Sequence, residues 1–171
     1  MNRSRGRRGA WWLAAAVVVA LAVVLTFIAF RGSGDDDRLS VKAYGAAIRP
    51  HLLDGGRIAA EDMRPGLADL EFHRVTPERF REEAAAWRRG MERVRQALAR
   101  LRPPHNLERA ASLYDLALRQ YEEAIDGFVV ASREPPSELA AAITAAVPTA
   151  ERADRTYDRA DALVKAALGR G

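Results

Sequence analysis

Apolar residues recur at alternating steps of four and three along three stretches of this 171-residue chain, and pairs of proline separate the stretches. This spacing places one apolar stripe along a single face of an α-helix, which is stable only when another helix covers that face. The stripes consist of Phe80, Ala84, Trp87, Met91, Val94, Leu98 and Leu101, then of Leu107, Ala111, Tyr114, Leu118, Tyr121, Ile125 and Phe128, and finally of Leu139, Ile143, Ala146, Ala150, Ala153, Tyr157, Ala160, Val164 and Ala167.

The ends of these helices carry residues that suit helix termini. Thr76 is predicted to cap the first of them, with Pro77 at its first position. The proline pairs at 103–104 and 135–136 separate the helices, because proline cannot continue an α-helix from the preceding residues. Ser137 is predicted to cap the third.

The segment before Thr76 also has one apolar helical face, which includes Val41, Tyr44 and Ile48. Proline and glycine interrupt this face several times between residues 50 and 66. The pattern fits either one long kinked helix over about 39–71 or two shorter helices.

Short links between long helices make neighbours in sequence antiparallel. The expected fold class is therefore all-α, with an antiparallel up-down-up-down bundle of about four helices over residues 39–169. A parallel coiled-coil oligomer would carry the same heptads, but the proline pairs favour folding back within one chain. The core is expected to contain Phe80, Trp87, Met91, Leu98, Leu107, Leu118, Ile125, Phe128 and Leu139.

Residues 11–30 read WWLAAAVVVALAVVLTFIAF and contain no charge, proline or glycine. Twenty helical residues span roughly 30 Å, the thickness of the hydrocarbon core of a bilayer. The sequence therefore predicts an N-terminal transmembrane signal-anchor helix in contact with the lipid bilayer. Its interfacial anchors would be Trp11 and Trp12 at one end and Phe27 and Phe30 at the other.

The flanks of this segment predict its orientation. The basic tail at 1–10 carries Arg3, Arg5, Arg7 and Arg8, whereas the tether at 31–38 contains three consecutive aspartates. The positive-inside rule places the tail in the cytoplasm and the bundle outside the cell membrane. Cleavage as a signal peptide is the alternative, but the apolar core is longer than such peptides have and ends in bulky residues.

The tail arginines also account for the whole net charge of +4. The remainder of the chain is neutral overall, so it has no basic surplus with which to neutralise phosphates. Nucleic acid is therefore not an expected partner.

The sequence offers no constellation that would carry catalysis. The chain has no cysteine, and its three histidines, His51, His73 and His105, lack the spacing of helical metal sites. No phosphate-binding glycine loop and no nucleophile elbow occurs. We therefore predict no catalytic residue, no metal site and no cofactor, and a protein that is not an enzyme.

Four aromatic residues could line a pocket if they converge inside the bundle: Trp87, Tyr114, Tyr121 and Tyr157. Each combines a large apolar area with a polar tip. The simpler interpretation is that they are core residues whose polar tips reach solvent or a carbonyl.

The layout resembles uncharacterised single-pass membrane proteins of actinobacterial type that carry a small extracytoplasmic helical domain. The resemblance rests on the arginine-rich tail, the alanine- and valine-rich anchor, GGRIAAEDMRPGLADLEF at 55–72 and PPHNLERAASLYDLALRQYEEA at 103–124. It implies a location and an architecture, and it assigns no activity to any residue.

Two functions fit these observations. The first is a non-enzymatic interaction or scaffolding module of the cell envelope, whose partner would be a membrane protein, an envelope component or a second copy of the chain. The second is an extracytoplasmic ligand-binding or sensing bundle. Because the cytoplasmic tail has no room for an output domain, such a sensor would act through a partner subunit.

Overall fold

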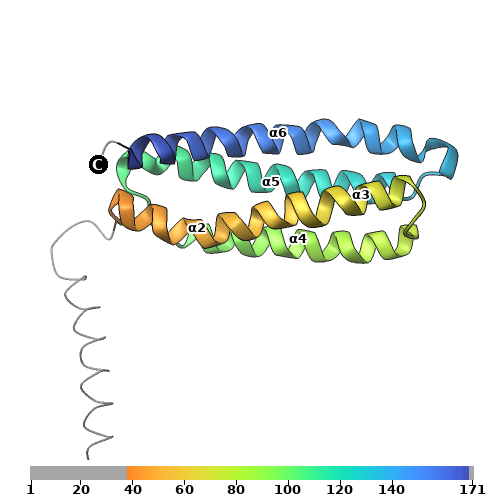
Figure 1. Ribbon diagram of the computed structural model, residues 1–171, viewed down its shortest axis with the longest axis horizontal. Coiled ribbons are helices and arrows are strands. Elements are labelled where there is room, and N and C mark those ends of the chain that lie inside the picture. The colour runs from red at the N-terminus through yellow and green to blue at the C-terminus, as the bar shows by residue number, and fades with distance from the viewer. Residues whose placement is uncertain (1–37, 170–171) are drawn as a thin grey trace, which may run out of the picture. The chain divides into compact units, whose positions relative to one another are not determined.

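The computed structural model describes residues 38–169, which form one compact unit of four long helical rods (Figure 1). No strand occurs within this range. The all-α prediction and the prediction of about four packed helices are therefore confirmed for this part of the chain. The helical elements are α2 (Val41–Arg57), η1 (Ile58–Met63), α3 (Arg64–Glu71), α4 (Pro77–Ala99), η2 (His105–Leu107), α5 (Glu108–Ala131) and α6 (Pro136–Leu168).

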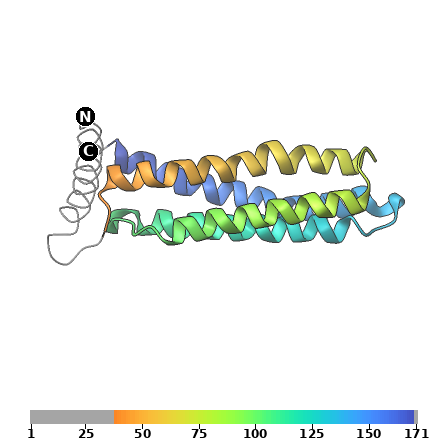
Figure 2. The ribbon, with the colours of Figure 1, turned by 90° about the horizontal axis from the view of Figure 1, so that it is seen from below.

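Rods that follow one another in the sequence run antiparallel and lie side by side, as both views show (Figures 1 and 2). The most extensive contact is between α5 and α6, followed by that between α4 and α5. The first rod, made of α2, η1 and α3, rests on α4 and on α6. Short links and amphipathic faces thus give the predicted up-down-up-down order within one chain.

The first rod is a single continuous helical run, which settles the alternative that the sequence leaves open. Its middle part, η1, is a π-helix. Pro65 follows this π-helix at the start of α3. In a regular α-helix the proline ring would collide with the carbonyl group of Glu61, and the wider π-helical turn gives that carbonyl room.

The predicted start of α4 is confirmed in detail. The Thr76 Oγ1 atom accepts a hydrogen bond from the backbone N–H of Arg79 at 3.2 Å, and Pro77 takes the first helical position. The predicted cap of α6 is wrong, because Ser137 lies inside the helix and Pro135 occupies the cap position. Pro136 then starts the helix, since its fixed φ suits the first position and no N–H is needed there.

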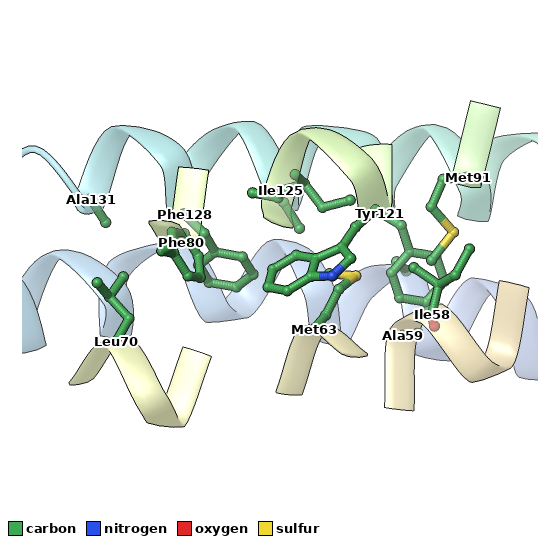
Figure 3. Close-up of a cluster of buried hydrophobic side chains, with 14 of the residues drawn as sticks. Ile58, Ala59, Met63, Leu70, Phe80, Met91, Tyr121, Ile125, Phe128 and Ala131 are labelled. Carbon is green, nitrogen blue, oxygen red and sulfur yellow. The ribbon is translucent and has the colours of Figure 1, made fainter. Parts of the chain in front are cut away.

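The buried side chains form two clusters. The larger one contains Phe80, Met91, Ile125 and Phe128, whose side chains point into the interior between the helices (Figure 3). The smaller one includes Tyr44, Leu107, Tyr114 and Val164. Of the residues expected in the core, Leu98 is half-buried and packs against both clusters. The others are all buried: Phe80, Trp87, Met91, Leu107, Leu118, Ile125, Phe128 and Leu139.

The start of the bundle is fastened to the link between α4 and α5. The backbone N–H of Leu39 donates to the carbonyl oxygen of Arg102 at 3.1 Å. The guanidinium of Arg38 donates to the carbonyl oxygen of Pro103 at 3.2 Å and also pairs with the carboxylate of Glu108. Together these contacts hold Arg38 and Leu39, which precede the helix cap Ser40, against the link between α4 and α5 at the same end of the bundle.

The first rod approaches α4 closely at a glycine. A β-carbon placed on Gly66 would lie only 2.4 Å from Cη2 of Trp87, so the indole ring occupies the space that any side chain at this position would need. Gly56, one of a pair of adjacent glycines in α2, has open space around the same position. The absence of a side chain is therefore required at Gly66 and not at Gly56.

Alanine substitutions at these two glycines are expected to act in opposite directions. Gly66→Ala should lower the free energy of unfolding by about 1–3 kcal/mol, because the buried indole must move. Gly56→Ala should raise it by about 0.5–1 kcal/mol, because glycine disfavours a helix interior. Urea titration followed by circular dichroism measures both changes. A Gly66→Ala variant as stable as the original chain would refute the close approach of Trp87.

Candidate functional site

Two of the four predicted pocket residues meet at the interface of α5 and α6. The rings of Tyr114 and Tyr157 are in edge-to-face contact, with centroids 5.3 Å apart and an interplanar angle of 68°. The hydroxyl of Tyr157 donates to the carbonyl oxygen of Leu52 in α2 at 3.3 Å. These residues thus connect three of the four rods at one level of the bundle.

An open groove of about 360 Å³ runs between α2 and α6 beside this aromatic pair. Its apolar lining is formed by Ile48, Leu52, Leu53, Val164 and Leu168. The side chains that line it recur along each helix at steps that keep them on one face. The two helices approach closely at the end of the groove, where a β-carbon on Gly45 would lie 3.2 Å from Leu168.

The hydroxyl of Tyr114 lies in this region without a hydrogen-bond partner among the residues that the structure describes. Tyr114 is only 1% exposed. A buried donor that makes no hydrogen bond costs about 1–3 kcal/mol relative to its hydrated state. Burial raises the pKa of the Tyr114 phenol well above its ordinary value, and the nearby Asp161 carboxylate raises it further. The phenol therefore stays protonated.

Charged groups stand at the edge of the groove. The ammonium group of Lys165 pairs with the carboxylate of Asp161 at 2.5 Å, one helical turn apart on α6. Arg49 lines the opposite side on α2 and is exposed. The walls of the groove are thus apolar, its rim is charged, and the buried Tyr114 is among the residues that line it.

Tyr121 lies two helical turns farther along α5 than Tyr114 and is engaged elsewhere. Its hydroxyl donates to Oδ1 of Asp154 at 2.5 Å, and Oδ2 of the same carboxylate accepts from Arg64 at 3.1 Å. Burial raises the pKa of Tyr121, and the hydrogen bond to Asp154 adds to the increase. This chain of contacts ties α5 to α6 and α6 to α3, and it satisfies the Tyr121 hydroxyl without any ligand.

Trp87 does not line the groove. Its ring packs edge-to-face on Phe80, with centroids 5.5 Å apart, and covers Gly66. It belongs to the larger core cluster, whereas Tyr114 belongs to the smaller one. The structure therefore brings together Tyr114 and Tyr157, and it places Trp87 and Tyr121 in separate packing roles.

The contrast between the two buried hydroxyls gives a matched pair of variants. Tyr121→Phe should lower the free energy of unfolding by about 2 kcal/mol, since it removes a hydrogen bond to a charged group. Tyr114→Phe should leave it unchanged or raise it by up to about 1 kcal/mol, because the hydroxyl that is removed has no partner. Urea unfolding at neutral pH compares the two. An equal loss in both variants would mean that the Tyr114 hydroxyl is satisfied in the folded chain.

Sequence reasoning missed the apolar residues that line the groove, Leu53 and Leu168 among them. The steps of three and four on α2 were visible in the sequence. However, no local pattern reveals that this face of α2 stands beside an open part of α6. That information depends on how far apart the two helices lie.

The three histidines lie at separate places. His51 lines a depression between α2 and α4, His73 lies in the turn after α3, and the Nδ1 atom of His105 is 3.2 Å from a carboxylate oxygen of Glu108. Among residues 38–169, no group of three or more histidine, aspartate or glutamate side chains is placed so as to hold a metal ion.

The predicted membrane residues lie outside the described part of the chain. These are the anchors Trp11, Trp12, Phe27 and Phe30 and the orientation-setting Arg3, Arg5, Arg7 and Arg8, together with most of the tether. Within residues 38–169, no helix combines the length and the hydropathy that crossing a bilayer requires.

Comparison with known protein families, with curated proteins and with solved structures gives no match to this chain. The described part of the chain is an all-α four-helix bundle with an open apolar groove between α2 and α6. Its function must be inferred from its own residues.

Proposed function

We propose that this chain is a membrane-anchored, extracytoplasmic helical bundle that acts by binding, as a non-enzymatic interaction or scaffolding module of the cell envelope. One observation supports this most directly: a twenty-residue apolar segment without charge, at 11–30, precedes a four-helix bundle whose first helix begins at Val41. Only ten residues separate the two, so the anchor would hold the bundle close to the membrane surface.

The dimensions of the bundle suit a partner-binding role. The 33 residues of α6 correspond to a rod about 50 Å long. Confinement to a membrane raises the effective concentration of such a rod toward other membrane proteins without any gain in intrinsic affinity. The proposed partners are a membrane or envelope protein, or a second copy of the chain.

The proposed location is testable because the chain contains no cysteine, so single cysteines can be introduced without background. Ser4→Cys marks the tail, and Arg155→Cys marks an exposed position on α6. A membrane-impermeant maleimide added to intact cells should label Arg155→Cys. It should label Ser4→Cys only after lysis.

The opposite labelling pattern would contradict the proposed orientation. Release of the chain from membranes by alkaline carbonate would contradict the anchor itself. A chain that lacks residues 1–30 is the matched control, and it should leave the membrane fraction altogether.

Partner binding is tested by a photo-crosslinking residue at one of two exposed positions, Arg88 on α4 or Arg155 on α6. One defined adduct that forms in membranes and disappears when residues 1–30 are deleted would support an interaction module. An adduct with twice the mass of the chain would identify the partner as a second copy. No adduct from any exposed position would contradict this function.

A second candidate function is an extracytoplasmic ligand-binding or sensing bundle that acts through a partner subunit. The observation that favours it is the apolar groove between α2 and α6, beside which Tyr114 keeps an unpartnered buried hydroxyl. Ligand pockets combine apolar walls with a few placed polar groups, and this groove has that composition.

A further inference from the structure

Basic side chains are concentrated on two neighbouring helical stretches, although the bundle as a whole is almost neutral. Helix α2 and residues 88–100 at the end of α4 together carry eight basic and two acidic residues. The remainder of the range 38–169 carries thirteen basic and eighteen acidic residues. The net charge of the chain conceals this separation, because the two regions offset each other.

Six exposed basic side chains on these two stretches form what we call the basic patch: Lys42, Arg49, Arg57, Arg89, Arg93 and Arg100. Steps of four and seven place Arg89, Arg93 and Arg100 along a single stripe of α4. Arg93 lines a hollow between α4 and α2, and Arg57 lines the same hollow from α2. Arg49 lines the α2–α6 groove on the other edge of α2. The patch therefore extends from α4 across the exposed surface of α2.

Most of the basic patch has no counter-charge in the folded chain. Arg57 pairs with Asp62 at 3.1 Å, whereas the other five members form no ion pair with any residue in the range 38–169. Asp54 lines the same hollow as Arg57 but pairs with none of them. By contrast, Arg95 on another face of α4 pairs with Glu122 on α5 at 3.0 Å. The patch is thus a set of charges that the fold does not use internally.

The basic patch begins at the end of the bundle where the chain enters it. The backbone N–H of Leu39 is bonded to Arg102, two residues after Arg100. From Arg100 the patch runs back to Arg89, about 16 Å along α4. The ten residues between the apolar segment 11–30 and Val41 reach at most about 35 Å when extended. The patch is therefore within reach of the surface of the bilayer that the proposed anchor would enter.

The chemistry of the patch suits phosphate groups. Five of its six members are arginines, and a planar guanidinium binds a phosphate group through two parallel hydrogen bonds. We propose that the basic patch binds the phosphate groups of anionic phospholipids, so that this side of the bundle lies against the bilayer. This inference rests on the proposed membrane anchor. Each basic side chain near an anionic membrane surface favours the docked bundle by roughly fivefold.

The three aspartates at 35–37 of the tether oppose this attraction only near the entry end. Exposed charges are screened over about 8 Å at physiological ionic strength. Arg57 lies about 25 Å along α2 from its cap Ser40, and Arg89 lies about 16 Å along α4 from Arg100. The far part of the patch therefore keeps its attraction for an anionic surface.

The test uses the full chain in nanodiscs of phosphatidylcholine, with or without phosphatidylglycerol. Because the chain has no cysteine, a fluorophore can be attached at Ala46→Cys, an exposed position on α2 inside the patch, or at Ser112→Cys, an exposed position on α5. A nitroxide on the lipid headgroups quenches a fluorophore that comes close to them. With phosphatidylglycerol we expect stronger quenching at Ala46→Cys than at Ser112→Cys. Pure phosphatidylcholine, or about 0.5 M salt, should abolish the difference.

Charge reversal at two pairs of arginines provides matched variants. Arg89→Glu combined with Arg93→Glu should lower the ratio of docked to undocked bundles by roughly 25-fold or more, at fivefold for each arginine lost. Arg152→Glu combined with Arg159→Glu changes the net charge equally, at exposed positions on α6 that form no ion pair within the described bundle. This second pair should leave the quenching at Ala46→Cys unchanged. Helical ellipticity confirms that both variants are folded.

The outcomes separate the basic patch from the anchor. A chain that does not remain with the nanodiscs in gel filtration would overturn the anchor and this inference together. A chain that remains, but whose two labels are quenched equally or independently of phosphatidylglycerol, would overturn the docking of the patch and leave the anchor intact. Equal effects of the two double variants would also overturn it. A label at Ala46→Cys whose anisotropy responds to soluble polyphosphate but not to phosphatidylglycerol would replace the bilayer with a free polyanion as the partner.

Discussion

Replacing Phe80 with alanine is expected to lower the free energy of unfolding by about 3–5 kcal/mol. Phe80 is 0% exposed and lies in the larger core cluster. The substitution removes most of a buried aromatic ring and leaves a cavity, and the loss of apolar burial and the cavity both destabilise the fold. The edge-to-face contact with Trp87 is lost as well.

Phe72 is the matched control for Phe80, since it is the same residue type at an exposed position of the same bundle. It is 63% exposed, and the guanidinium carbon of Arg74 lies 5.3 Å from its ring centroid. A surface cation–π contact contributes about 0.5–1 kcal/mol, so Phe72→Ala should cost no more than that. Urea unfolding of both variants makes the comparison, and equal losses would contradict the packing of Phe80.

Alkaline pH is expected to unfold the bundle cooperatively above about pH 10. All four tyrosines of the chain lie in the bundle, and burial raises the pKa of each of them, that of Tyr157 to about 12. The unfolded chain releases these protons near pH 10, whereas the folded chain retains them. The stability that depends on neutral phenols is therefore complete below pH 10 and is lost as the pH rises toward 12.

The size of this effect follows from the number of phenols involved. Each buried tyrosine contributes a loss of about 1.4 kcal/mol for each pH unit above the pKa of the unfolded chain. Tyr114, Tyr121 and Tyr157, which have the largest increases in pKa, together give a slope of roughly 4 kcal/mol per pH unit, comparable with the whole stability of a small domain. Phenolate absorbance and helical ellipticity should consequently change together in one transition.

The variant Tyr114→Phe tests this interpretation, because it removes one of the three phenols with the largest increases in pKa and should make the dependence on pH less steep by about a third. Phenolate absorbance that rises near pH 10 while the helical ellipticity persists would show that the phenols are accessible in the folded bundle. That result would contradict their burial.

The helices and their order could be predicted from the sequence because the evidence for them is local. Steps of four and three define a helical face within one segment, and Thr76 followed by Pro77 marks a helix start without reference to any other part of the chain. In the folded chain these apolar faces are buried. Phe80 on α4 and Phe128 on α5 are examples.

Features that depend on packing between helices could not be predicted in this way. The spacing of apolar residues does not specify the π-helical turn before Pro65 or the cap of α6 at Pro135 instead of Ser137. The four aromatic residues of the predicted pocket all follow the same apolar spacing. Only the packing of the helices places Trp87 in the larger core cluster and Tyr114 in the smaller one. The groove likewise depends on the distance between two helices.

The fastening of Arg38 and Leu39 to the α4–α5 link has a mechanical consequence. A pulling force that enters the bundle at its first residue does not act on α2 alone, because the carbonyl oxygens of Arg102 and Pro103 and the carboxylate of Glu108 share it. The load is thus divided between α2, the α4–α5 link and the start of α5 before α2 can peel away from its neighbours. A bundle connected in this way resists tension at its first residue through more than one of its helices.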